Sequence, residues 1–195
     1  MSQMKRFSLA PIVRRHYSAF RSTGSRSMTP TVIVMVFLVP LLVGAAVGLY
    51  APEIPAVALT PTLAATGVLT GAFLAGFVLL TNLRLKIRED EALSYRLGLT
   101  RLVGETAVTA LYLVIACLAA IIFGVAMAVF GPVISAKIPL VGQSVVGMFA
   151  AVLAHTGITA LTFLRRMFSV YEQLFRADFS PRLMSVQSNE NDKAG

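Results

Sequence analysis

Charged residues are scarce in this chain, because Asp, Glu, Lys and Arg occupy only 13% of its 195 positions. Water-soluble domains carry about 25%. Hydrophobic residues occupy 56% of the positions instead, and the mean hydropathy is +0.77. This shortage of charge excludes an ordinary water-soluble domain and indicates that most of the chain lies in a membrane.

Catalytic and metal-binding motifs are also absent from the sequence. The chain has one cysteine and two histidines, and it contains no HExxH, CxxC, GxSxG or glycine-rich phosphate-binding motif. The adjacent acidic residues 89–91 are typical of a solvated turn rather than of a metal site. The single Cys117 lies in an apolar run, where a packing residue is predicted. We therefore expect a protein that is not an enzyme and that has no metal ion and no cofactor.

Four long apolar runs dominate the sequence, and none contains Lys, Arg or Asp. Each reaches the length of about 20 residues that a helix needs to cross a hydrocarbon core about 30 Å thick. Because lipid offers the backbone no hydrogen-bond partners, helices are expected, and the runs lack the alternation of barrel strands. The sequence thus predicts an all-α integral membrane protein with four transmembrane helices. The runs are 31–50, 62–81, 102–130 and 140–164.

The basic residues are distributed very unevenly around these runs. All but one of the 17 Lys and Arg residues lie before the first run, between the second and third, or after the fourth, and the exception is Lys137. Cytoplasmic loops retain Lys and Arg, so both termini and the middle loop are predicted to face the cytoplasm. The formal charge of +8 follows from this orientation, and anionic lipids are the expected partners.

The sequence around the transmembrane domain, 31–164, predicts further elements. Its cytoplasmic loop is 83–101. In the basic segment 1–30, Ile12, His16, Tyr17 and Phe20 recur at helical spacing, and arginines fall around the other side. This spacing predicts an amphipathic helix that lies at the inner membrane surface.

Two boundaries are predicted in the second half of the chain. Gly131 and Pro132 predict the end of the third span, followed by a second outer loop. After the fourth span, a basic and aromatic segment predicts a cytoplasmic helical extension over 165–178. The polar remainder, 179–195, is expected to be disordered.

The fourth run carries polar residues on one face. Their spacings of three and four keep them on one side of a helix. The face consists of Ser144, Met148, Ala151, His155, Thr159, Thr162 and Arg166. His155 lies about 15 Å from Arg165 at helical rise, near the middle of the membrane. An ionisable residue there is a candidate functional residue; the alternative is a neutral histidine that is hydrogen-bonded to Thr159 or to a neighbouring helix.

Glu105 is the acidic residue one turn inside the third span. It follows Arg101 by four residues, which favours a local ion pair. In an oligomer, it could instead form an acidic ring near the mouth of a pore. The candidate pore-lining residues are therefore Ser144, Ala151, His155, Thr159, Thr162 and Glu105.

The order of these features resembles a group of small four-span membrane proteins encoded in bacterial anti-phage defence operons. Four stretches carry the resemblance: HYSAFR in the basic segment, VFLVPLLVG in the first span, LLTNLRLKIRED after the second, and LVGETAVTALYLV at the third. Hailong-type membrane effectors look like its functional analogue. The resemblance implies an oligomeric ion-conducting pore in a bacterial inner membrane, held closed by a cytoplasmic partner protein or a nucleotide-derived signal and opened on infection.

The resulting hypothesis is a homo-oligomeric, gated pore whose opening depolarises the membrane. An anionic regulator or lipid headgroups would bind the basic cytoplasmic surface. The candidate residues there are Arg14, Arg15, Arg84, Lys86, Arg165 and Arg166. Two alternatives remain: a non-conducting membrane anchor or accessory subunit, in which the polar face only packs helices together, and a component of a lipid or small-solute transporter.

Overall fold

The computed structural model describes residues 9–18, 30–50, 56–89 and 97–191. These residues are helical except for Leu9 and Ile138, and no strand occurs among them. Within these described ranges, four helices are long and apolar enough to cross a membrane. The prediction of an all-α protein with four candidate membrane spans is confirmed. The candidate spans are Pro30–Tyr50, Ala58–Glu89, Gly98–Lys137 and Pro139–Leu174.

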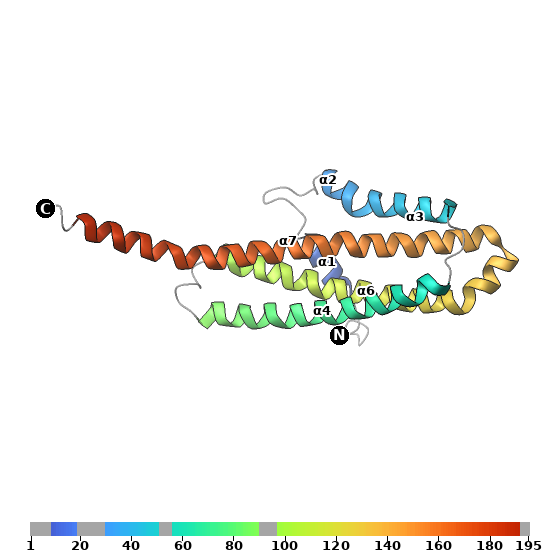
Figure 1. Ribbon diagram of the computed structural model, residues 1–195, viewed down its shortest axis with the longest axis horizontal. Helices are drawn as coiled ribbons and strands as arrows, with labels where there is room; N and C mark the ends of the chain where they lie inside the picture. The colour runs from blue at the N-terminus through green and yellow to red at the C-terminus, as the bar shows by residue number, and fades with distance from the viewer. Residues whose placement is uncertain (1–8, 19–29, 51–55, 90–96, 192–195) are drawn as a thin grey trace, which may run out of the picture.

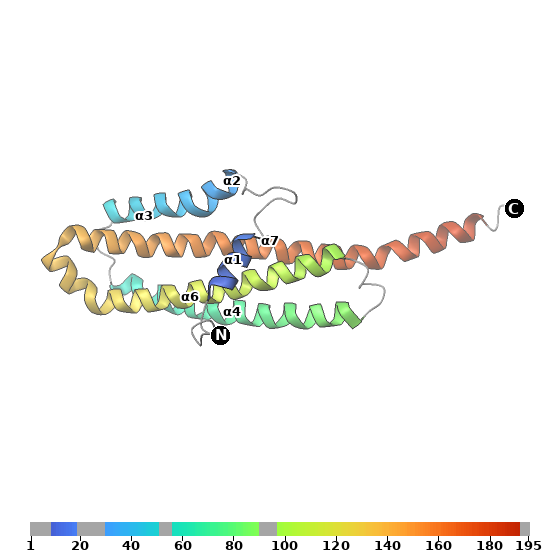
Figure 2. The same cartoon turned by 180° about the vertical axis from the view of Figure 1, so that it is seen from behind.

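The long helices lie roughly parallel to the long axis of the molecule (Figure 1). Both views place α6 (Leu97–Lys137) between α4 (Ala56–Glu89) and α7 (Pro139–Asn191), and the first span along the other side of α7 (Figures 1 and 2). That first span consists of α2, η2 and α3 in continuous succession. The elements are α1 (Ala10–Ser18), α2 (Pro30–Ile33), η2 (Val34–Leu38), α3 (Val39–Tyr50), α4 (Ala56–Glu89), α6 (Leu97–Lys137) and α7 (Pro139–Asn191).

The hydrophobic core lies between α4, α6 and α7. Phe73 from α4 and Phe163 from α7 meet edge to face, with ring centroids 5.7 Å apart. Leu113 and Cys117 of α6 are fully buried between them and their neighbours. The cysteine is thus a packing residue, as the sequence predicts. Large apolar side chains such as Leu49 and Ile122 are more than two-thirds exposed, which suits surfaces that face lipid.

The first span widens into a π-helical turn at Val34–Leu38. There, the N–H of Val39 donates to the carbonyl of Val34, five residues earlier. The cause lies in Pro40, which has no N–H and whose ring would clash with the carbonyl four residues before it in a regular α-helix. The wider turn accommodates the proline without ending the span.

The connection between α6 and α7 differs from the prediction. Gly131 and Pro132 do not end the third span, because α6 continues to Lys137 with the proline inside it. A proline removes one backbone hydrogen bond and bends a helix, and the remaining bonds can carry it onward. The turn is reduced to Ile138, whose carbonyl accepts from the N–H of Gly142 at 3.1 Å. The predicted second outer loop is therefore mostly helix.

The last helix also extends further than the sequence predicted. α7 is a single helix of 53 residues that reaches Asn191, whereas the prediction ended the helical extension at 178 and left 179–195 disordered. The sequence has no glycine between Gly157 and Gly195, so the usual residue that stops a helix is missing from this stretch. Residues 192–195 lie outside the described part of the chain.

A short helix is present where the amphipathic one was predicted, at Ala10–Ser18. It packs against α6, with His16 fully buried and Arg14 and Arg15 exposed. Part of its predicted membrane-facing side thus contacts protein. Its placement at the inner membrane surface, like the cytoplasmic location of both termini, stays a prediction.

Candidate functional site

A chain of hydrogen bonds crosses the bundle at His155. Its Nε2 atom lies 2.8 Å from the Tyr112 hydroxyl on α6. Its Nδ1 atom lies 3.0 Å from the carbonyl oxygen of Val36 in the first span. Both ring nitrogens are therefore bonded to neighbouring helices, which is the hydrogen-bonded arrangement predicted as the alternative to a functional residue, and Thr159 is not their partner. One side chain joins α7 to α6 and to the first span.

The Val36 carbonyl accepts this bond because the backbone leaves it without its α-helical donor. In an α-helix that donor is the N–H four residues later, and residue 40 is a proline. Val36 is only 4% exposed, and a buried carbonyl with no partner costs about 1–3 kcal/mol. The ring of His155 thus compensates for the proline of another helix.

The chemistry of the acceptor determines where the protons lie when the ring is neutral. A carbonyl oxygen only accepts, so Nδ1 of His155 carries the proton. Nε2 then accepts from the Tyr112 hydroxyl. The Tyr17 hydroxyl of α1 lies 3.2 Å from that of Tyr112 and becomes its donor. The hydrogen-bond chain runs from α1 through α6 and α7 to the first span.

His16 strengthens the contact between α1 and α6. Its ring stacks on Tyr112 with centroids 4.0 Å apart and an interplanar angle of 5°. Burial, and then the positive charge of Arg166, lower its pKa from 6.5 to about 4. The docked helix thus requires a neutral His16, because a charged ring would be desolvated beside a guanidinium.

Acid is therefore expected to undock α1. His16 has a pKa of 6.5 when free and about 4 when docked, so docking is fully favoured above pH 6.5 and weakens as pH falls toward 4. At pH 5, the free energy that favours docking of α1 is reduced by about 2 kcal/mol. A nitroxide attached through Ser18→Cys should gain mobility between pH 7.5 and pH 5. A spin-labelled His16→Phe variant, which keeps a stacked ring but cannot titrate, should show no change. If the label gained equal mobility with His16 and with His16→Phe, protonation of His16 would not control docking.

The predicted polar face of α7 is divided between the surface and the interior. Ser144 is exposed and Thr162 is half-buried, whereas Thr159 is only 1% exposed. The hydroxyl of each donates to the carbonyl four residues earlier, at 2.8 to 3.0 Å. Their hydrogen-bonding capacity is thus partly satisfied within the helix.

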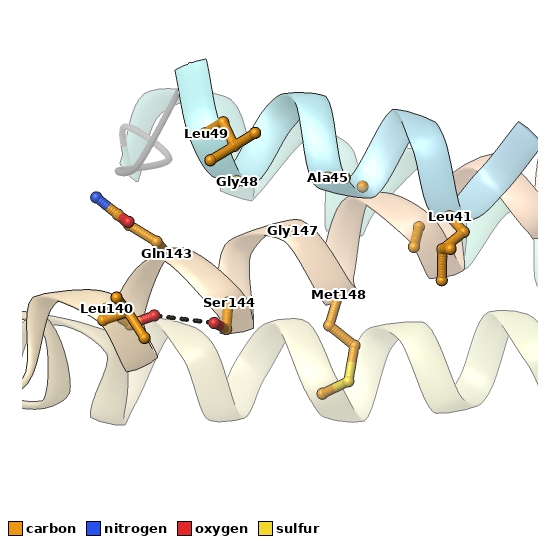
Figure 3. A pocket seen from close by; sticks show the side chains of 11 residues that line it. Leu41, Ala45, Gly48, Leu49, Leu140, Gln143, Ser144, Gly147 and Met148 are labelled. Atoms are coloured by element: carbon orange, nitrogen blue, oxygen red, sulfur yellow. Dashed lines mark hydrogen bonds between the residues drawn. The ribbon is translucent and has the colours of Figure 1, made fainter.

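The first span covers this face of α7 by close backbone contact. A Cβ atom added at Gly44 would lie 2.7 Å from Cβ of Ala151, and one added at Gly147 would lie 2.6 Å from the carbonyl oxygen of Gly44. Glycines therefore let α3 and α7 approach. Beside them, a groove of about 530 Å³ includes Ser144, whose hydroxyl bonds to the Leu140 carbonyl (Figure 3).

Glu105 lies in the local ion pair that one hypothesis predicted. Its Oε1 atom is 2.8 Å from Nε of Arg101, and the two side chains are 28% and 67% exposed. Ion pairs this open to solvent contribute about 0–1 kcal/mol. The pair orients Arg101 more than it stabilises the fold.

The predicted basic surface separates into two pockets. Arg15 and Arg84 line one pocket together with Arg101, which sequence reasoning did not include. Arg165 and Arg166 line another, of about 390 Å³, between the first span and α7. Arg14 and Lys86 are exposed and line neither.

Sequence reasoning missed Tyr112, Tyr17 and Val36. A tyrosine in a long apolar run carries no signal of its partner, and the sequence places Tyr112 and His155 43 positions apart. The signal that was present is Pro40, because any proline inside a span leaves a carbonyl four residues earlier in need of a donor. A search for polar side chains at the same depth could have suggested His155.

Comparison with known proteins gives no relative to assist the assignment. No protein-family model, no curated protein and no solved structure matches this chain.

Proposed function

We propose that this protein is the subunit of a homo-oligomeric, gated membrane pore whose opening depolarises the membrane. The observation that carries the proposal is His155, an ionisable side chain bonded through both ring nitrogens in the middle of a candidate span. Ionisable groups are expensive in lipid and are retained chiefly along ion or proton pathways. The hydrogen bond from His155 to the Val36 carbonyl holds the first span against α7 at this point.

The first span is well suited to act as the moving part. It packs mainly on α7 among the described helices, and it contains a π-helical turn beside Pro40. Such turns are frequent at functional sites. Movement of this span away from α7 would uncover Ala151, His155 and Thr162, which are half-buried. In the closed arrangement, the first span thus partly covers these three candidate lining residues, while Ser144 stays exposed.

A surface for assembly lies on α4. Ala64, Gly67, Gly71 and Ala75 follow spacings of three and four and are all exposed. A Cβ atom added at either glycine would meet nothing within 4 Å. Small exposed faces of this kind allow helices of neighbouring subunits to approach in lipid, which supports a homo-oligomer.

The experiment is the membrane potential of bacteria that express the protein. The wild type should depolarise the cells, as measured with a potential-sensitive dye. A Gly67→Leu/Gly71→Leu variant should return the signal to that of cells without the protein, because leucines keep the subunits apart. The matched control is Gly157→Leu on α7, another glycine with open space around it, which should behave as the wild type.

Three other outcomes would reject or replace the proposal. An unchanged signal with all variants present in the membrane would indicate a non-conducting anchor. Depolarisation that requires an added solute would indicate a transporter. Depolarisation by the double variant, with a smaller particle in detergent, would reject the need for an oligomer.

The sequence resemblance supports assignment of this activity to anti-phage defence. Under that proposal, a cytoplasmic regulatory protein or an anionic signal keeps the pore closed until infection. Cells that carry the protein with its genomic neighbours should lose membrane potential after phage addition, and cells with the α4 double variant should not. Equal plaque counts on the two strains would remove the defence role.

A further inference from the structure

Three arginines from three helices converge in one small cavity. Arg15 from α1, Arg84 from α4 and Arg101 from α6 line a pocket of about 200 Å³. We name it the three-arginine pocket. Glu105 is its acidic member, so the formal charge of the lining is +2. Thr100 and Ser18 add hydroxyl groups.

The backbone of α6 is shaped to admit one of these arginines. The guanidinium of Arg84 lies over Gly104, where an added Cβ would be 3.8 Å from both its Cζ and Nη1 atoms. A large side chain at this position would compete with the guanidinium for space. Arg101 is oriented by its bond to Glu105 at 2.8 Å. Two of the three cations thus have defined positions.

The pocket lies where the spans leave the apolar part of the sequence. Arg84 follows the second run, 62–81, by three positions, and Arg101 directly precedes the third run, 102–130. That depth corresponds to the headgroup region of a bilayer. Basic pockets between transmembrane helices at this level are suited to lipid phosphates.

From this geometry we propose that the three-arginine pocket binds a phosphate group. Guanidinium groups form paired hydrogen bonds to phosphate oxygens, which makes arginine better suited to this role than lysine. The volume is below the range of about 300–1,000 Å³ that is usual for drug-sized ligands. It suits a single phosphate or diphosphate group, carried by a lipid headgroup or by a small soluble anion.

Occupancy would fasten α1 to the membrane domain. Arg15 belongs to α1, whereas Arg84 and Arg101 belong to α4 and α6, so an anion shared among them joins the three helices. The same α1 carries Tyr17, the first member of the hydrogen-bond chain that leads to His155 and the first span. Control of opening by this anion rests on the proposed pore, whereas binding of the anion does not.

The test measures binding in the full chain without any measurement of conduction. In one arm, inorganic pyrophosphate is titrated into the detergent-purified protein by calorimetry. In the other, native mass spectrometry counts lipids retained from vesicles of phosphatidylglycerol and phosphatidylcholine. In whichever arm the wild type binds, Arg84→Gln should weaken binding about tenfold, as expected for loss of one charge-assisted contact. Glu105→Gln should strengthen it several-fold, because the competing carboxylate is removed.

The matched control is Arg88→Gln, because Arg88 is also exposed on α4 and does not line the pocket. This variant should leave pyrophosphate binding and lipid retention unchanged. Binding in the lipid arm alone identifies a headgroup site, binding in the pyrophosphate arm alone identifies a soluble anion, and binding in both identifies a general phosphate site. Equal losses with Arg84→Gln and Arg88→Gln, or no binding in either arm, would overturn the proposal. The opposite effect of Glu105→Gln keeps the test decisive if Arg84→Gln fails to fold.

Discussion

A Gly147→Leu variant is expected to be less stable than the wild type by about 3 kcal/mol, since overpacking of a close contact costs about 1–3 kcal/mol and the obstacle here is backbone. A Cβ atom at residue 147 would lie 2.6 Å from the Gly44 carbonyl oxygen and 3.4 Å from Cα of Gly48. No rotamer change can relieve contacts with backbone atoms. The first span must therefore move away from α7.

Thermal unfolding of the protein in detergent measures this effect. A loss of about 3 kcal/mol corresponds to a fall in Tm of about 6–12 °C for a chain of this size. Gly157→Leu on the same helix is the control, because a Cβ atom there meets nothing within 4 Å. It should leave Tm unchanged or slightly higher, since leucine favours helix over glycine. Equal Tm values for the two variants would show that the glycine contact does not hold the first span.

Substitution of His155 by leucine should have the second large effect. It removes the donor to the Val36 carbonyl and the partner of the Tyr112 hydroxyl, which lie 3.0 and 2.8 Å from the ring. Interhelical hydrogen bonds in membranes contribute about 0.6–2 kcal/mol each, so the expected loss is about 2 kcal/mol. Because the first span loses its polar attachment, the same variant should depolarise cells more strongly than the wild type.

His155→Asn separates the two bonds. The amide nitrogen of asparagine can take the place of Nδ1 and donate to Val36, but the shorter side chain cannot reach Tyr112. The free energy of unfolding should fall about half as much in this variant as in His155→Leu. Its signal in the dye assay should also stay closer to that of the wild type. If leucine and asparagine gave identical stabilities and identical dye signals, the bond to Val36 would have no role in holding the span.

Composition predicted the four spans well, because a helix in lipid must be both long and apolar. The ends of the helices were harder to predict. Pro132 looked like a stop because prolines end many helices, yet α6 continues past it to Lys137. The boundary at 178 was set by loss of apolar residues, whereas a helix outside a membrane needs only favourable backbone geometry to continue.

The contacts between helices could not be read from periodicity. The spacing on α7 grouped His155 and Thr159 on one side, but a helical period says nothing about which neighbour covers that side. His155 meets Val36 of the first span, and the placement of that span depends on Gly44 and Gly147, 103 positions apart by their numbering. The arginine pocket could not be predicted for the same reason. Arg15 and Arg84 were both candidate residues, but their position beside Arg101 depends on how α1 packs against the other helices.

The length of α7 has a mechanical consequence. A helix of 53 residues measures about 80 Å at 1.5 Å per residue, whereas the hydrocarbon layer is about 30 Å thick. Figure 1 shows its C-terminal part projecting beyond the other helices. From the glycine crossing at Gly147, the helix runs about 12 Å back to Pro139 and about 66 Å forward to Asn191 at this rise per residue. A small tilt about the crossing therefore moves the C-terminal tip much further than the other end, and a weak force applied at the tip acts on the short arm with increased leverage.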